Sequence, residues 1–257
     1  MCLIHSGRVR LQVDFQELYG KTMSIIRDRE EDGMEAFAAA SIRAGNCCGA
    51  KCPPNPQRLS DLYASGREAY DLFHLFLDKA ARHVRGAECY KKGNQPPGMK
   101  GIYRVIEKGM FKYNENGRVK LDLSKVRDLV RGGIIHRSME GLANVVKYFE
   151  KCHKSGEITI CRIKDRFTYP SASGWTDMMI NFYLAGDRGH HVCEVQLIHR
   201  KMFTQRTVQE GHHAYNTFRA AQELLMTVSR ALGADDPASD KALNELKEKV
   251  VLSEKIF

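Results

Sequence analysis

Apolar residues recur with the period of an α-helix over two N-terminal stretches, residues 11–45 and 60–86. This period places the apolar side chains on one helix face, which can pack on a core. The segment GNCCGAKCPPNP lies between the two stretches and KKGNQPPG, at 91–98, follows the second. Both segments are rich in Gly and Pro and predict loops. The second loop is the best candidate for a boundary between a helical N-terminal region, 1–95, and a domain at 96–257.

The remaining chain alternates between helical and strand-like patterns. Apolar residues at helical spacing predict one helix from Met99 and another in SMEGLANVVKYFEKC. Shorter apolar runs predict strands in VRDLVRGGIIHR, EITICRI, WTDMMINFYL and HVCEVQLI. The tail returns to helical patterns at about 201–231 and 239–252. This order predicts an α+β fold, in which helices flank a mixed β-sheet of about five strands and helical extensions stand at both ends.

Polar and apolar residues alternate within these strands, and strand side chains point alternately to the two faces of a sheet. Within each of the last three predicted strands, one set of polar residues stands at alternate positions and so projects to one face. The sets are Arg162, Lys164 and Arg166 in the first of these strands, Trp175, Asp177 and Asn181 in the second, and Glu194 and Gln196 in the third. One face of the sheet could therefore carry a site with cations for phosphate, carboxylates for Mg²⁺ and an aromatic plane for a base. An antiparallel sheet with one solvated face gives the same alternation, so both interpretations stay open.

The helix predicted from Met99 carries a ridge of cations at a spacing of four residues, which consists of Lys100, Arg104, Lys108 and Lys112. Like charges at this spacing repel one another, so the ridge costs helix stability unless an anion lies against it. A solvated surface is the commoner explanation for such a ridge. The whole chain has 40 Lys and Arg against 31 Asp and Glu, a net charge of +9. This balance favours anionic partners such as phosphates, nucleic acid or acidic membrane surfaces.

The eight cysteines are spread along the chain and do not form a compact disulfide framework, which favours a reducing compartment. The segment GNCCGAKCPPNP contains no C-x-x-C pair, so idle thiols in a loop are favoured over a metal site. No apolar run approaches the roughly 18 residues of a membrane span, and MCLIHSGRVR is too short and broken for a signal peptide. We therefore expect a cytoplasmic protein without a membrane partner.

The order of several short motifs is more specific than any one of them. A basic helix is followed by a strand headed by Asp128 and Leu129, then by R-I-K-D, a Pro, S-G-W, E-V-Q-L and G-H-H-A-Y. This order resembles the synthetase domain of the RelA/SpoT family, which reads as a basic helix, D-L-x-x-x-R-I, R-x-K-D, P, N-G-Y-R-S, E-V-Q-I-R-T and E-H-x-x-Y. The resemblance covers about 100–220, close to half of the chain.

The resemblance implies a nucleotidyltransferase-like fold and transfer of pyrophosphate from ATP to the 3′-hydroxyl of GDP or GTP, with release of AMP. It implies that Asp128 binds Mg²⁺ and that Glu194 assists the metal or accepts the proton of the attacking hydroxyl. It also implies two sets of ligand-binding residues. They are Lys100, Arg104, Lys108, Arg131, Arg162 and Lys164 for ATP, and Trp175, Gln196, His212 and Tyr215 for the acceptor.

The chain departs from the family pattern mainly on the acceptor side. Gly133 stands where the family has an Arg, and Arg131 lies two residues earlier. SGWTDMM replaces the family's N-G-Y-R-S-L-H, which removes its Asn, Arg and His. Trp175 keeps an aromatic plane, but stacking alone does not select a base strongly. The metal and triphosphate chemistry therefore matches the family better than the identity of the acceptor does.

Three functional hypotheses follow. The first is a Mg²⁺-dependent pyrophosphokinase that makes a guanine-nucleotide alarmone, without a hydrolase half, because no His-Asp dipeptide occurs. The second is pyrophosphate or nucleotidyl transfer to another acceptor, such as the 3′ end of a tRNA, which the net charge favours. The third is a non-catalytic nucleotide- or RNA-binding module, against which the presence of both Asp128 and Glu194 speaks. A homo-oligomer is compatible with each of them.

Overall fold

The computed structural model describes residues 17–49, 52–111, 121–171 and 174–208. A mixed sheet with the strand order β1-β2-β5-β4-β3 forms its centre, and only β2 and β5 are parallel neighbours. The predicted mixed sheet of about five strands is therefore confirmed. The strands are β1 (Glu88–Cys89), β2 (Arg131–His136), β3 (Ile158–Asp165), β4 (Met178–Leu184) and β5 (Cys193–His199).

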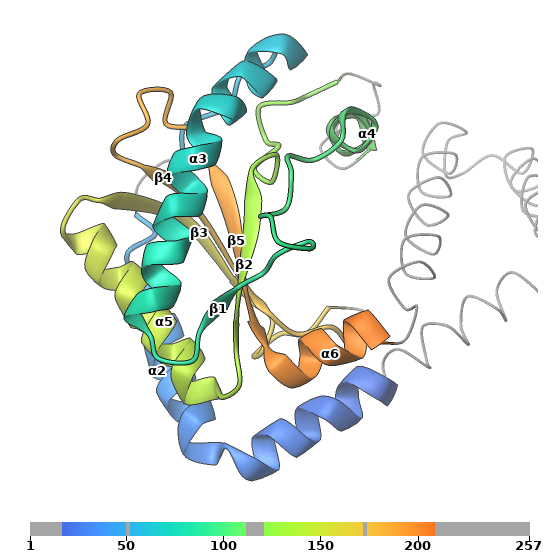
Figure 1. The fold of residues 1–257 in the computed structure, drawn as a ribbon, viewed down its shortest axis with the longest axis vertical. Coiled ribbons are helices and arrows are strands. Elements are labelled where there is room, and N and C mark those ends of the chain that lie inside the picture. Colours follow the sequence, from blue (N-terminus) through green and yellow to red (C-terminus); the bar gives the residue numbers. More distant parts are fainter. Residues whose placement is uncertain (1–16, 50–51, 112–120, 172–173, 209–257) are drawn as a thin grey trace, which may run out of the picture.

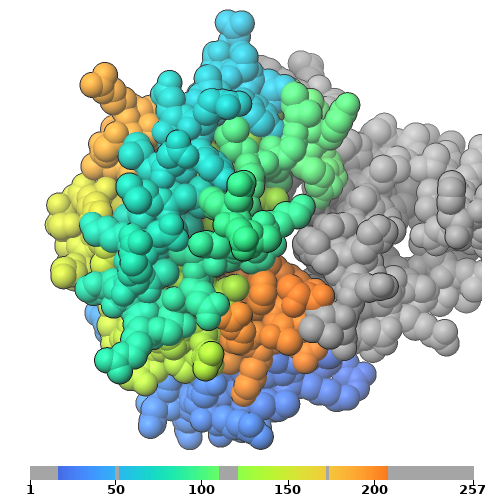
Figure 2. Space-filling view, in the orientation of Figure 1, coloured from blue at the N-terminus to red at the C-terminus, as the bar shows by residue number. Residues whose placement is uncertain are grey.

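Helices flank both faces of this sheet. In Figure 1, α2, α3 and α5 lie on one side, and α4 and α6 lie on the other. In the space-filling view of Figure 2, the side chains of α3 and α5 form the left side of the molecule. No helix within the described ranges is long and apolar enough to cross a bilayer. The helices are α2 (Glu31–Asn46), α3 (Leu59–His83), α4 (Ile102–Phe111), α5 (Met139–Lys154) and α6 (Arg200–Val208), and residues 17–29 are also helical.

The helix predicted over residues 11–45 is not continuous in its described part, because it breaks at Glu30. The backbone of Glu30 leaves the helical region, with φ −136° and ψ 40°. Its carboxylate accepts a hydrogen bond from the Met139 amide at 2.7 Å and lies 3.2 Å from Nε2 of His199. These long-range contacts turn the chain between the two helices. The predicted helices beyond residue 208 lie outside the described residues.

The core is built around Phe182 of β4. Its ring lies 5.6 Å from Phe73 and 5.4 Å from Phe76, both of α3, and 5.4 Å from Phe149 of α5. All four rings are buried, and such burial contributes about 2–3 kcal/mol for each side chain. Helix α3 and strand β1 precede residue 95, yet they belong to the same core and the same sheet as the later strands. A functional division of the chain at this point stays a prediction.

Strand β3 contains a β-bulge, and beyond it the side chains point to the opposite face of the sheet from the one that regular alternation would give. Ile160 pairs with Phe182 and Arg162 pairs with Asn181, which leaves Cys161 as an extra residue. Because an extra residue shifts the alternation by one position, Ile160 faces the core while Arg162 faces the opposite side. Ile160 is fully buried and Arg162 is exposed, although their sequence parity is the same.

Two helical glycines should respond in opposite ways to Gly→Ala. A Cβ on Gly141 would lie 1.9 Å from ring atoms of His136, which is held by the Arg85 carbonyl at 3.0 Å, so we expect a destabilisation of about 1–3 kcal/mol. Gly20 is exposed, and a Cβ there would meet no atom within 4 Å, so Gly20→Ala should stabilise by about 0.5–1 kcal/mol. Urea unfolding of both variants measures the difference, and shifts of the same sign would contradict this packing.

Candidate functional site

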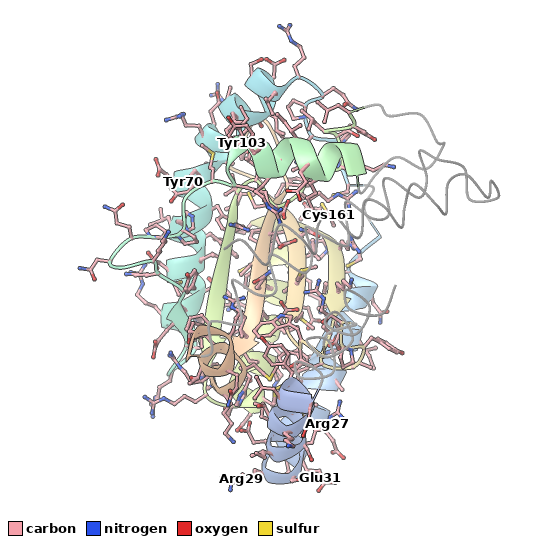
Figure 3. The ribbon with its side chains drawn as sticks, turned by 90° about the vertical axis from the view of Figure 1, so that its right-hand side faces the viewer. Arg27, Arg29, Glu31, Tyr70, Tyr103 and Cys161 are labelled. Atoms are coloured by element: carbon pink, nitrogen blue, oxygen red, sulfur yellow. The ribbon has the colours of Figure 1, made fainter. Side chains whose placement is uncertain are left out.

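The face of the sheet opposite the main core carries a row of polar residues. Arg131 of β2 is paired with Glu194 of β5, Glu194 with Asn181 of β4, and Asn181 with Arg162 of β3. Directly paired residues project from the same face of a sheet. Figure 3 views this face, which α4 crosses at one end and α6 borders at the other. The next row on the same face consists of Gly133, Gln196, Met179 and Lys164.

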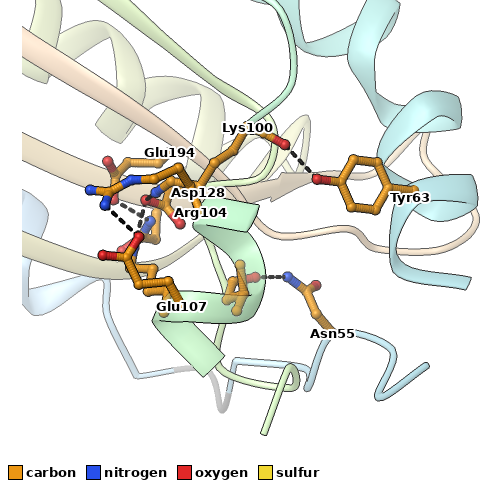
Figure 4. Close-up of polar contacts among 10 residues, drawn as sticks. Asn55, Tyr63, Lys100, Arg104, Glu107, Asp128 and Glu194 are labelled. Atoms are coloured by element: carbon orange, nitrogen blue, oxygen red, sulfur yellow. Dashed lines mark hydrogen bonds and ion pairs between the residues drawn. The ribbon is translucent and has the colours of Figure 1, made fainter. Parts of the chain in front are cut away.

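Asp128 lies just before β2 and is buried beneath α4 (Figure 4). Its Oδ2 contacts the ammonium groups of Lys100 and Lys108, the second at 2.5 Å. The backbone of Lys100 is held as well, since its amide donates to the Leu129 carbonyl at 2.9 Å and its carbonyl accepts from the Tyr63 hydroxyl at 2.5 Å. The anion that stabilises the predicted cationic ridge is therefore a carboxylate of the protein itself.

This ion cluster shifts the protonation equilibria of its members. Burial alone would raise the pKa of Asp128, but the charges of Lys108 and Lys100 outweigh it and hold the pKa well below its usual range. Burial lowers the pKa of Lys100 to about 8, although Asp128 opposes the change. Asp128 thus remains anionic, and two cations share its charge.

Glu194 is the second buried carboxylate of the site. Burial raises its pKa, and the nearby charge of Asp128 raises it further. Its closest hydrogen-bond donor is the side-chain amide of Asn181, 3.5 Å from Oε2. Figure 4 shows Glu194 and Asp128 on the same side of α4. Burial and the charge of Asp128 therefore make this carboxylate a stronger base than an exposed glutamate.

The two carboxylates fit a divalent cation. Oδ1 of Asp128 is buried and has no hydrogen-bond partner within the described residues. In the described part of the chain, no three His, Cys, Asp or Glu side chains are grouped to hold a metal. Mg²⁺ is commonly held by one or two carboxylates together with substrate phosphates and water. Asp128 and Glu194 could therefore hold such an ion only in a site that a ligand completes.

The cations of β3, and Arg166 just after it, differ in what they contact. Arg162 and Lys164 are exposed on the polar face, and neither forms an ion pair with an Asp or Glu of the described ranges. Burial lowers the pKa of Lys164, and the charges of Arg166 and Arg162 lower it further. Arg166, by contrast, binds the buried carboxylate of Asp177 at 2.9 Å. Arg162 and Lys164 are thus the two that present charge to a ligand.

Arg104 contacts a different carboxylate from Lys100 and Lys108. Its guanidinium contacts Glu107 on the same helix, as Figure 4 shows. The predicted ridge of cations therefore contacts two different carboxylates in the structure. Lys100 and Lys108 contact Asp128, and Arg104 contacts Glu107, one helical turn away. A role of Arg104 in binding ATP stays a prediction.

Trp175 has protein neighbours on its ring. Its ring meets Tyr19 edge to face at 5.3 Å, and the guanidinium of Arg206 lies over it at 5.1 Å. Burial lowers the pKa of Arg206, a residue of α6 that the sequence motifs did not single out. A base could stack here only on the remaining face or after Arg206 moves. His212 and Tyr215, the other two predicted acceptor residues outside the strands, lie beyond the described residues.

Comparisons with known proteins find structural neighbours only. No protein-family profile and no curated protein sequence matches the chain. The structure is similar to the small alarmone synthetase 1 of Bacillus subtilis bound to its product pppGpp, at 13% identity and a TM-score of 0.45 over 72% of this chain and 92% of that one.

Two further neighbours are similar at the same level. Small alarmone synthetase 2 of Bacillus subtilis has 15% identity and a TM-score of 0.46 over 77% of this chain and 99% of that one. A GTP pyrophosphokinase family protein of Streptococcus pneumoniae has 15% identity and a TM-score of 0.40 over 75% and 95%. These names describe those proteins, so the activity of this chain has to be argued from its own residues.

The two carboxylates should affect stability in opposite directions. Asp128→Asn leaves two ammonium groups, one of them buried, without their partner, and we expect a loss of about 3 kcal/mol. Glu194→Gln removes a carboxylate whose ionised form is disfavoured by burial and by Asp128, so we expect a gain. The raised pKa means that Glu194 costs stability as pH rises above its ordinary range, so the gain should be larger at pH 8 than at pH 5. Melting temperatures at both pH values test this, and a stabilised Asp128→Asn would contradict it.

Proposed function

We propose that this chain is a Mg²⁺-dependent pyrophosphokinase, which transfers pyrophosphate from ATP to the 3′-hydroxyl of a guanine nucleotide and releases AMP. The proposal rests on one observation: two buried carboxylates, Asp128 and Glu194, occur together with a sheet face that presents the cations Arg162 and Lys164. Transfer of phosphoryl groups depends mostly on positioning and on neutralisation of charge, and these residues supply both.

The metal would be held by Asp128, through the oxygen that lacks a partner, and by Glu194. When bound, Mg²⁺ would neutralise charge on the phosphates of the donor. Lys100 and Lys108 restrain Asp128 from the opposite side, so its carboxylate has a defined position before any ligand arrives. Each ammonium has three N–H donors, so Lys108, which is only half-buried, could bind Asp128 and a phosphate oxygen together.

The exposed cations would bind the polyphosphate chain of ATP. Arg162 and Lys164 project from β3, and Arg131 stands at the other end of the same row on β2. Guanidinium groups bind phosphate oxygens through two parallel hydrogen bonds, which orients the chain as well as neutralising it. Glu194 lies between Arg131 and Arg162 in the row, where the reacting phosphate would be flanked by cations.

Glu194 would act as the general base. The acceptor's 3′-oxygen attacks the β-phosphorus of ATP, the bond from that phosphorus to the bridging α–β oxygen breaks, and AMP leaves with that oxygen. The proton of the attacking hydroxyl would pass to Glu194, because burial and the charge of Asp128 raise the pKa of this carboxyl and so strengthen it as a base. Asn181 donates to the same carboxylate and would orient it.

The identity of the acceptor is inferred from the order of the sequence motifs. Gln196 lies on the polar face of the sheet, and Trp175 lies at the end of that face that α6 borders. Gln196 shares its row with Lys164, which places an amide beside the cations of the donor site. The chain keeps the E-V-Q motif but replaces the family's N-G-Y-R-S with S-G-W-T-D. A guanine nucleotide is therefore the first acceptor to test, within a panel that includes other nucleotides and RNA.

Activity can be tested with γ-labelled ATP, Mg²⁺ and that panel. We expect label to move to a guanine nucleotide with release of AMP, and Glu194→Gln to lower the rate by about 10²–10⁴-fold as expected for loss of a general base. Glu68→Gln, on the exposed face of α3, is the matched control and should keep the full rate. Label that migrates with RNA would identify another acceptor, and absence of AMP with every acceptor would refute the proposal.

Donor binding can be tested apart from turnover. Arg162→Met should weaken ATP binding by about 10–100-fold, since a hydrogen bond to a charged group contributes about 1.5–3 kcal/mol. The same substitution at Arg67, an exposed residue of α3, should leave the affinity unchanged. Isothermal titration calorimetry at two salt concentrations measures both effects. Equal affinities for the two variants would exclude Arg162 from the donor site.

A further inference from the structure

A cluster of four aromatic rings and one guanidinium lies at the end of the polar face that α6 borders. The guanidinium of Arg206 lies over the ring of Trp175, 5.1 Å from its centroid, and over the ring of Phe203 at 5.5 Å. Tyr19 meets Trp175 edge to face at 5.3 Å, and Tyr90 meets Phe203 in the same way at 5.5 Å. Figure 1 shows α6 above the helix of residues 17–29 at this end of the molecule.

The guanidinium of Arg206 has no anionic partner among the described residues. It is partly buried, and its described contacts are the two aromatic rings. The buried carboxylate of Asp177 binds Arg166 at 2.9 Å through one oxygen, and its other oxygen has no hydrogen-bond partner within the described ranges. A guanidinium carries five N–H donors, and a ring attracts its charge without using them along their own directions. Arg206 therefore keeps donors for an anionic ligand.

One face of the Trp175 ring cannot hold a guanidinium and a base together. A base that stacks on the face covered by Arg206 has to displace the guanidinium and end its attraction to the ring. A nucleoside offers the displaced guanidinium no new partner. A nucleotide does, because a guanidinium binds phosphate oxygens through two parallel hydrogen bonds.

We propose that Arg206 makes the aromatic end of the polar face selective for nucleotides over nucleosides. The base takes the place of the guanidinium on Trp175, and the guanidinium binds a phosphate of the same ligand. This exchange rests on the proposed function, since it takes Trp175 as the residue on which the acceptor base stacks. It adds a specificity-determining residue of α6 that the sequence motifs did not single out.

The contact in the ligand-free chain can be tested first. Trp175 is the only tryptophan, so its fluorescence reports on this ring alone. We expect acrylamide to quench Trp175 more strongly in Arg206→Ala than in the unsubstituted protein, because the substitution uncovers one ring face. Arg200→Ala is the matched control, since Arg200 belongs to the same helix but contacts Glu88 at 2.5 Å. Equal quenching in all three proteins would overturn the proposal.

Titration of the same three proteins with guanosine and with GDP, followed by Trp175 fluorescence, measures the exchange. In Arg206→Ala guanosine has no competitor for the ring, so its affinity should rise about 2–30-fold, as expected when a cation–π contact no longer has to be broken. The preference for GDP over guanosine should fall about 10–100-fold in that variant, because a hydrogen bond to a charged group is lost. Arg200→Ala should show neither change. An unchanged preference in Arg206→Ala, as expected for a base on the other ring face, would refute the exchange.

Release of AMP by the same proteins, given ATP and GDP, separates this inference from the proposed function. AMP release together with an unchanged preference refutes the exchange and leaves the pyrophosphokinase in place. No AMP release, together with a preference that Arg206→Ala reduces, supports the exchange at a nucleotide-binding site and refutes the pyrophosphokinase. If neither guanosine nor GDP binds to the unsubstituted chain, the exchange is refuted whatever the AMP assay shows.

Discussion

One extra residue in β3 determines which of its side chains reach the polar face of the sheet. With regular alternation, Ile158, Ile160, Arg162 and Lys164 would all project to one side. The bulge at Cys161 lets the two isoleucines pack in the core and the two cations face away from it. This change brings Arg162 into one row with Asn181, Glu194 and Arg131, so the cationic part of the polar face depends on it.

The carboxylates of the site are held at some expense of stability. Asp128 is satisfied on one oxygen by two ammonium groups and left without a partner on the other. Glu194 is buried beside that charge with one weak hydrogen bond. Arrangements of this kind are unfavourable in a resting protein and become favourable when a cation or an anionic ligand completes them. The core of phenylalanines on the other face of the sheet supplies the rigidity that such a site requires.

The two faces of the sheet therefore have different roles: one packs into the hydrophobic core, and the other carries the polar residues of the site. Helices α2, α3 and α5 cover one face, and the aromatic cluster around Phe182 joins α3 and α5 to it. Helix α4 lies against the other face through the contact of Lys108 with Asp128, and Lys100, just before the helix, contacts the same carboxylate. The N-terminal helices are thus part of the support of the site.

The sequence alone determined the elements that have strong periodicity: the strands around Glu194 and Asn181, the helix after Ser138 and the polar parity of Arg162 and Lys164. It also placed Asp128 at the head of a strand, because local patterns of apolar residues carry that information. Only the tertiary structure decided the break at Glu30, the bulge at Cys161, the turn of Lys100 and Lys108 towards Asp128, and the packing of Arg206 on Trp175. These features arise from contacts between residues far apart in the chain, and no local pattern records which distant side chain will meet another.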